Sequence, residues 1–282
     1  MLRKHLNYNR LRTEVAAEPA QILESRGHVL LEQVLDPDMV RRVKEDVDRV
    51  FREYPPDGRA SALEPPRAPM FRYEMFNRSA LVQEIIGNRR VMDSVEPLLG
   101  EDCHVIANTA WRNPPDREYA PDGQQWHVDG GPYVVRPPEV PWPADIPYPI
   151  FVVTAQFYLE PVTLDDGPTA VLPGSHRSGR LPPCERTWDL NLEYEGRGAE
   201  VHVASPGDVT LFVSDTWHRR MPQSEHTTGR EFVQCAYARR EIAQRILPTD
   251  RCCAANEQAR ERAKTLRDRQ LIGLHAPCFY DG

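Results

Sequence analysis

The sequence predicts a mainly β fold, a sandwich or barrel, with helices before and after the strands. Short runs of β-favouring residues recur between Cys103 and Ala238, turn residues separate them, and helix-like segments flank this stretch. The chain has 282 residues. That length is common for one all-β domain, and it allows a core large enough to fold without disulfides.

The N-terminal part is predicted to hold a short strand and three helices. Residues 27–31 form an apolar run, and Asp36 follows as a helix N-cap with proline at the next position. Apolar residues then recur at helical spacing and predict an amphipathic helix to about Phe51: Val40, Val43, Val47 and Val50. Two shorter helices are expected beyond a loop rich in proline, at 80–86 and 91–99.

From Cys103 onward, short apolar runs alternate with turn signals rich in Pro, Gly, Asn and Asp. Strands are predicted at 103–111, 151–159, 169–172, 200–203, 209–213 and 231–238. A charged helical segment at 255–269 is expected to follow them.

The stretch 130–149 carries too many prolines for a central strand and is predicted to be a long loop. It directly follows the most chemically interesting residues of the chain, so we expect it to form a lid or a pocket wall. Its candidate substrate contacts are Tyr133, Val134 and Trp142.

Charge and hydropathy narrow the class of protein. The net charge is −7, and the pI is about 5.8. The sequence therefore lacks the basic footprint of a nucleic-acid-binding protein. No stretch approaches the roughly 18 apolar residues of a membrane span, and the N-terminus lacks the apolar core of a secretory signal. We expect a cytoplasmic protein with reduced thiols that binds neither nucleic acid nor membranes. The sequence does not indicate an oligomeric state.

A His-x-Asp motif provides the first candidate for metal binding. On a strand, His127 and Asp129 would point to the same face. Together with a distant second histidine, such a pair forms the two-His-one-carboxylate triad of non-haem Fe(II) oxygenases. His218 follows the predicted strand 209–213 and is the candidate third ligand. The other histidines, His176 among them, are expected to be structural.

These residues, together with 166–176 and Pro206-Gly207-Asp208, resemble the phytanoyl-CoA dioxygenase family of Fe(II)/2-oxoglutarate oxygenases. The resemblance spans about residues 20–240. It implies a double-stranded β-helix, the cupin-like jelly-roll, and we treat residues 1–282 as a single domain of this kind.

The resemblance also implies residue roles. His127, Asp129 and His218 match the iron ligands, and Arg230 matches the arginine that pairs with the distal carboxylate of 2-oxoglutarate. Further cosubstrate contacts fall on Thr109, Gln156 and Arg72. The sequence departs from the best-known member two residues after the distal histidine, where Arg220 replaces a serine.

The activity implied is oxidation of a small molecule with O₂ and 2-oxoglutarate, releasing succinate and CO₂. Related halogenases have a small residue in place of the carboxylate, so Asp129 favours hydroxylation over halogenation. Desaturation, epoxidation and cyclisation stay open. The substrate is expected to be a biosynthetic intermediate, such as a secondary metabolite.

Two other classes of protein are compatible with parts of this pattern. One is an oxygen-independent cupin-like isomerase or hydrolase that uses the same three ligands on another metal. The other is a non-catalytic jelly-roll binding module. Arg230 and the family motifs argue against the first, and the cost of burying an unused His and Asp argues against the second.

Overall fold

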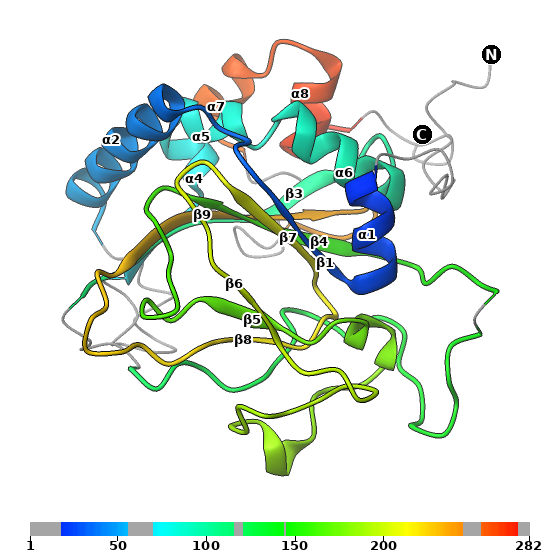
Figure 1. The fold of residues 1–282 in the computed structure, drawn as a ribbon. Helices are drawn as coiled ribbons and strands as arrows, with labels where there is room; N and C mark the ends of the chain where they lie inside the picture. The colour runs from blue at the N-terminus through cyan, green and yellow to red at the C-terminus, as the bar shows by residue number, and fades with distance from the viewer. Residues whose placement is uncertain (1–17, 56–69, 116–120, 144, 245–254, 276–282) are drawn as a thin grey trace, which may run out of the picture.

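Two antiparallel sheets lie face to face, and helices cover the outer face of the larger one (Figure 1). The computed structural model describes residues 18–55, 70–115, 121–143, 145–244 and 255–275. Its elements in chain order are α1 (Glu18–Arg26), β1 (His28–Leu31), α2 (Pro37–Glu53), β2 (Phe71–Tyr73), α4 (Met75–Arg78), α5 (Ala80–Ile85), α6 (Arg89–Leu99), β3 (His104–Asn113), β4 (Val152–Tyr158), β5 (Thr169–Val171), η4 (Ser175–Ser178), η5 (Cys184–Arg186), β6 (Glu200–His202), β7 (Val209–Val213), β8 (His218–Arg220), β9 (Arg230–Ala238), α7 (Glu257–Arg262) and α8 (Leu266–Leu271).

The larger sheet has six strands in the order β1-β7-β4-β9-β3-β2, and the smaller one has three in the order β6-β5-β8. Strands adjacent in a sheet come from distant parts of the chain: β4, for example, lies between β7 and β9. This is the predicted jelly-roll with flanking helices, so the fold class is confirmed.

Helix α2 forms as its sequence predicts. The side chain of Asp36 accepts a hydrogen bond from the Met39 amide at 2.8 Å, and Pro37 occupies the first turn. The four valines at helical spacing are all buried. They form the apolar stripe that holds α2 against the sheet.

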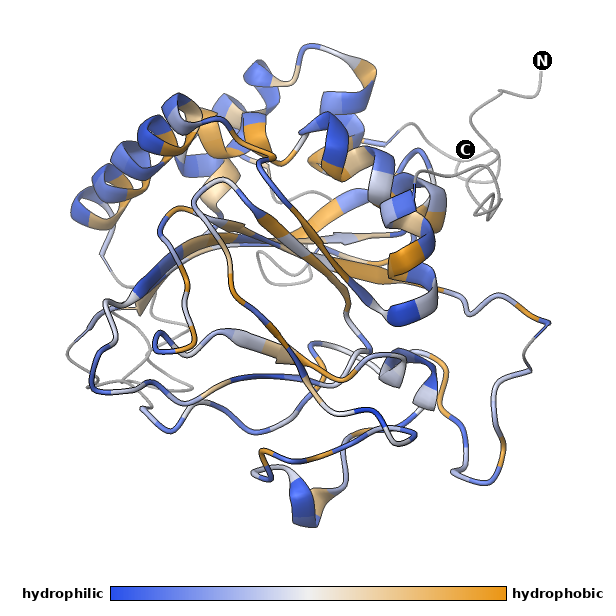
Figure 2. Ribbon diagram, viewed as in Figure 1, coloured by the Kyte–Doolittle hydropathy of each residue, from blue (hydrophilic) through white to orange (hydrophobic). Residues whose placement is uncertain are grey.

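The main hydrophobic core lies between the helices and the outer face of the larger sheet. It joins apolar side chains of α2, α5 and α6 to alternate residues of the central strands. Figure 2 shows the same separation, with the apolar residues of the helices turned toward the sheet and their charged residues turned away. The helices therefore stabilise one face of the sheet and leave the other to face the smaller sheet.

Some elements differ from the sequence-based prediction. Helices α1 and α4 and strands β2 and β8 were not predicted, because each is short and lacks a clear apolar period. The charged C-terminal segment contains two short helices, α7 and α8. No described residue of 130–149 lies in a helix or strand, in agreement with the predicted loop. None of the helices in the described parts is long and apolar enough to cross a membrane.

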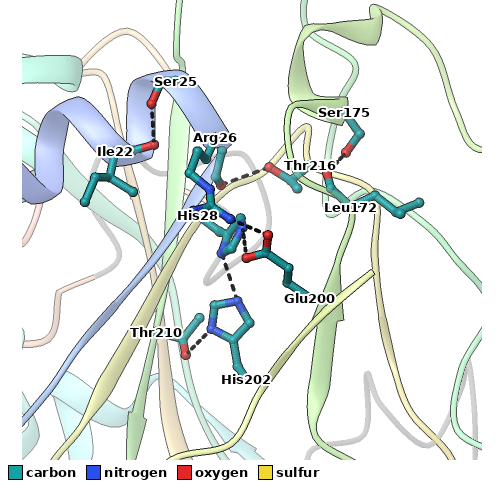
Figure 3. Close-up of polar contacts among 11 residues, drawn as sticks. Ile22, Ser25, Arg26, His28, Leu172, Ser175, Glu200, His202, Thr210 and Thr216 are labelled. Atoms are coloured by element: carbon teal, nitrogen blue, oxygen red, sulfur yellow. Dashed lines mark hydrogen bonds and ion pairs between the residues drawn. The ribbon is translucent and has the colours of Figure 1, made fainter. Parts of the chain in front are cut away.

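Two buried histidines join the edge strands of the two sheets (Figure 3). His28 of β1 and His202 of β6 contact each other through Nδ1 and Nε2 at 3.0 Å. On the outer side, His28 Nε2 lies 3.3 Å from a carboxylate oxygen of Glu200, which also pairs with Arg26. On the inner side, His202 Nδ1 lies 3.0 Å from the Thr210 hydroxyl. Both histidines lie outside the candidate metal-binding triad, and their structural role stays a prediction.

Candidate active site

Three side chains, two from one loop and one from strand β8, converge between the sheets. His127, Asp129 and His218 each offer a ligand atom, and these atoms all lie within 4.8 Å of one another. The two histidines are held in register because their backbones exchange a pair of hydrogen bonds, at 2.9 and 3.0 Å. The predicted triad is therefore assembled from positions ninety residues apart in the chain.

The hydrogen bonds of the two imidazoles fix which ring nitrogen faces the centre. His127 Nδ1 lies 2.7 Å from the Gln125 carbonyl, and His218 Nδ1 lies 2.8 Å from the Thr216 carbonyl. A carbonyl can only accept, so each Nδ1 carries the proton and the lone pair lies on Nε2. Histidine ligands of metal ions are oriented in this way. The donor set thus fits a divalent first-row metal such as Fe(II).

The carboxyl of Asp129 is held in its ionised form. Burial raises the pKa of Asp129. The nearby imidazoles of His218 and His127 and the hydroxyl of Thr154 lower it by more than burial raises it, so the net shift is downward. The Thr154 hydroxyl donates to Asp129 Oδ2 at 3.2 Å. Asp129 Oδ1 lies 3.4 Å from His218 Nε2, where the pKa of His218 is raised in spite of burial. An anionic ligand beside two imidazoles suits a dication.

One local expectation was wrong. The motif was predicted to lie on a strand, but His127 makes only an isolated bridge to His218. The chain then turns, and the Asp129 amide donates to the Ser214 carbonyl at 3.2 Å. The two side chains converge because this turn redirects Asp129, and strand alternation is not the cause.

The triad lines a cavity of about 310 Å³ between the sheets. Strand residues of alternate positions form most of its wall, as expected where one face of a sheet looks inward. As far as the described residues define it, the lining consists of Trp111, Asn113, Gln124, His127, Val128, Asp129, Gln156, Thr169, Phe212, His218, Arg219, Arg220, Arg230, Phe232 and Gln234.

Arg230 reaches this cavity from the first position of β9 and is 6% exposed. Its Nε donates to the Asn113 side-chain oxygen at 3.0 Å, and its guanidinium lies 5.1 Å from the centre of the Phe232 ring. These two contacts orient the guanidinium. Its placement agrees with the predicted carboxylate clamp, whose role stays a prediction.

Gln156 also lines the cavity, in the middle of β4. Its side-chain oxygen accepts hydrogen bonds from Tyr158 and Thr169, both at 3.0 Å. Thr109 is a cross-strand partner of Gln234 and shares its face of the sheet, but it is not part of the lining. Its hydroxyl instead accepts a hydrogen bond from the Trp111 indole at 2.9 Å. Thr109 therefore positions Trp111, which does line the cavity.

Arg72 is a correction, because the structure does not bring it to the cavity. It pairs with Ala110 across β2 and β3, and cross-strand partners share a face. Ala110 belongs to the core beneath the helices. The Arg72 guanidinium accordingly donates to the carbonyls of Tyr54 and Phe51 at the end of α2. It anchors a helix terminus on the opposite side of the sheet.

The predicted substrate contacts in the 130–149 loop also lie outside this cavity. Val134 and Trp142 pack against the main core, and Trp142 lines a separate groove. The Tyr133 ring stacks on Phe151 at 5.3 Å. None of the three residues lines the described cavity, so the cavity does not support a role for them in substrate binding.

A single buried carboxyl attaches both ends of the loop. Asp215 Oδ2 accepts from the Tyr133 amide at 3.0 Å and from the Tyr148 hydroxyl at 3.1 Å. A Cβ at Gly131 would lie 2.5 Å from Asp215 Oδ1, so this approach requires glycine. Burial raises the pKa of Asp215, and the two hydrogen bonds oppose that shift.

Several cavity residues were not anticipated from the sequence. Phe232 and Gln234 follow Arg230 at intervals of two, and Thr154, which bonds Asp129 without lining the cavity, precedes Gln156 by the same interval. Once Arg230 and Gln156 were candidates, the two-residue period of a strand would have found them. Trp111 and Asn113 are cross-strand partners of Phe232 and Arg230, a relation that only the sheet register reveals.

The chain belongs to the phytanoyl-CoA dioxygenase family, whose sequence profile matches residues 23–226. This confirms the family that the motifs predicted. Iron with 2-oxoglutarate, the predicted cofactor pair, is confirmed at the level of that family and agrees with the donor set of the triad. No curated protein sequence matches the chain.

Solved structures share the fold at low sequence identity. The epimerase SnoN, in complex with Fe³⁺, alpha ketoglutarate and nogalamycin RO, is 16% identical with a TM-score of 0.59, covering 82% of this chain and 86% of that one. EctD from S. alaskensis, with 2-oxoglutarate and 5-hydroxyectoine, is 18% identical with a TM-score of 0.61, covering 84% and 79%. HygX from Streptomyces hygroscopicus, with nickel and 2-oxoglutarate, is 14% identical with a TM-score of 0.59, covering 82% and 89%.

Proposed function

We propose that this protein is an Fe(II)- and 2-oxoglutarate-dependent dioxygenase that hydroxylates an unactivated C–H bond of a small molecule. The observation that carries the proposal is the joint presence, in one cavity, of the His-Asp-His triad and the oriented guanidinium of Arg230. The proposal extends to residues 1–282 as a single domain with its core at about residues 20–240.

The triad would hold the metal through His127 Nε2, Asp129 and His218 Nε2. Three protein ligands would leave room on the metal for cosubstrate and oxygen. Bound iron and 2-oxoglutarate together supply the oxidising power for attack on a C–H bond. The protein contributes binding, orientation and exclusion of water.

Arg230 would hold the distal carboxylate of the cosubstrate through paired N–H···O bonds. Asn113 and Phe232 fix its direction, so the guanidinium needs little reorganisation on binding. Gln156 would present its amide to the same ligand, because Tyr158 and Thr169 hold its oxygen in place. The largely buried walls limit access of water to the reacting centre.

Two features support hydroxylation of a small molecule as the outcome. Asp129 occupies the position that a small residue takes in related halogenases. The cavity of about 310 Å³ also suits ligands of small-molecule size. SnoN is described as an epimerase and EctD was solved with 5-hydroxyectoine, so this fold serves more than one outcome.

The test is an anaerobic titration of metal-free protein with Fe(II) and then 2-oxoglutarate, followed by the visible charge-transfer absorption of the chelate. We expect the band in the parent protein, its loss in His127→Ala and its weakening in Arg230→Ala. The exposed His226 provides the control, because His226→Ala should leave the band intact. No band in folded, iron-loaded parent protein would overturn the 2-oxoglutarate assignment.

Hydroxylation is tested separately with a panel of small molecules under ¹⁸O₂. A substrate should stimulate succinate formation, and its product should gain one labelled oxygen atom. A product that loses two hydrogens, or one of unchanged mass, would replace hydroxylation by desaturation or epimerisation.

A further inference from the structure

Arg220 lies on the same strand as the third metal ligand and faces the same cavity. Side chains alternate along β8, so His218 and Arg220 project to the same side of the strand. Arg219 between them also contributes to the cavity lining, but its guanidinium lies near the Trp126 and Trp188 rings. Arg220 is 3% exposed and lines the cavity.

The position of Arg220 along the strand sets its distance from the metal site. Two residues of a strand advance by roughly 6.6 Å. A five-carbon dicarboxylate separates its two carboxyl carbons by about 5 Å. A ligand bound at the triad through one end would therefore bring its far carboxylate to the level of Arg220.

The neighbours of Arg220 mark the same level of the cavity. Its cross-strand partner is Thr169, whose hydroxyl donates to the Gln156 side-chain oxygen at 3.0 Å. Gln156 belongs to the larger sheet and lines the cavity beside Gln234. Arg220 therefore comes from the smaller sheet and Arg230 from the larger, and both line one cavity.

We propose that Arg220 is a second cosubstrate-binding residue, which clamps the distal carboxylate of 2-oxoglutarate together with Arg230. An ionised carboxylate offers about four acceptor positions, enough for two guanidiniums. Two planar guanidiniums, from Arg220 and Arg230 on opposite walls, fix a carboxylate more strictly than one guanidinium and the serine hydroxyl that Arg220 replaces. The inference deepens the proposed function and rests on it.

The experiment compares Arg220→Gln with the parent protein in the anaerobic Fe(II) titration, with band intensity giving the dissociation constant of 2-oxoglutarate. We expect 10- to 100-fold weaker binding of 2-oxoglutarate, the range for a lost charge-assisted hydrogen bond. The affinity for Fe(II) should stay unchanged. Arg41→Gln, on the exposed face of α2, is the control for removing an arginine elsewhere.

A cosubstrate without the distal carboxylate makes the test specific. 2-Oxobutyrate should bind the parent and Arg220→Gln equally, because the carboxylate that Arg220 would hold is absent. Arg220→Lys keeps the charge without the fork and should fall between parent and Arg220→Gln, which covers the case in which Arg220→Gln does not fold.

The outcomes separate this inference from the proposed function. Undiminished 2-oxoglutarate affinity in folded Arg220→Gln or Arg220→Lys would overturn the role of Arg220 alone. Equal weakening for both oxo acids would also overturn it, since it would indicate general damage to the site. No band in the parent would overturn both proposals.

Discussion

The two faces of strand β4 illustrate how the larger sheet divides its tasks. Val153, Ala155 and Phe157 belong to the core beneath the helices. Of the residues between them, Thr154 donates to Asp129, the proposed metal ligand, and Gln156 lines the cavity. Strands β7 and β9 follow the same rule. Stability and binding are thus assigned to opposite faces of one sheet, at neighbouring positions of the same strand.

The largest expected effect comes from truncating, one at a time, two adjacent residues that lie on opposite faces of β4. Phe157→Ala should lower the free energy of unfolding by about 3–5 kcal/mol, because it leaves a cavity in the core. Gln156→Ala should cost much less stability but weaken 2-oxoglutarate binding. Denaturant unfolding and the anaerobic titration, run on both variants, measure the two quantities. A large stability loss in Gln156→Ala would contradict the division between the faces.

The polar side of the sheet should also make the fold sensitive to acid. Burial, together with Arg26, lowers the pKa of His28 to about 4, and burial with the neighbouring His28 lowers that of His202 to about 3. In the unfolded chain these two histidines titrate near pH 6.5. It therefore binds more protons below that pH, and stability present above pH 6.5 should fall by on the order of a few kcal/mol toward pH 4.

Unfolding free energies measured at intervals from pH 7 to pH 4 check this expectation. The double variant His28→Leu with His202→Leu should flatten the pH profile, whereas His226→Leu on the surface should not. An unchanged slope in the double variant would place the acid sensitivity elsewhere.

The smallest effect concerns the Thr154 hydroxyl behind Asp129, the proposed metal ligand. Thr154→Val removes the hydrogen bond to Asp129 Oδ2 while keeping the shape of the side chain. Outer partners of metal ligands typically contribute 10- to 100-fold to metal affinity, so Fe(II) should bind Thr154→Val more weakly by about this factor. Thr154→Ser keeps the hydroxyl and should restore the affinity. Equal affinities of the valine and serine variants would show that the hydroxyl is not used.

Much of this division is readable from the sequence, because it rests on local periods. The valines of α2 and the apolar runs of β4, β7 and β9 identified their elements directly. His127, Asp129 and His218 were recognised from their chemistry and their place in the family pattern, and the structure brings them together.

What the sequence did not reveal depends on register across strands. Arg72 was assigned by counting residues, and counting cannot show that its strand pairs Arg72 with Ala110 on the helix-covered face. Trp111 enters the cavity wall for the complementary reason, as the partner of Phe232. The 130–149 loop was rightly identified as a loop, but the carboxyl that attaches it lies more than sixty residues away along the chain.

That attachment has a consequence for how the protein can diversify. Because Tyr133 and Tyr148 both bind Asp215, the segment between them begins and ends at the same point of the scaffold. Outside Val134 and Trp142, which pack against the core, changes in its length and composition are then not expected to displace His127, Asp129 or His218. The segment is a natural cassette for loop grafting: exchanging its interior while retaining Gly131, Tyr133, Tyr148 and Asp215 would vary the outer surface of the enzyme on an unaltered catalytic frame.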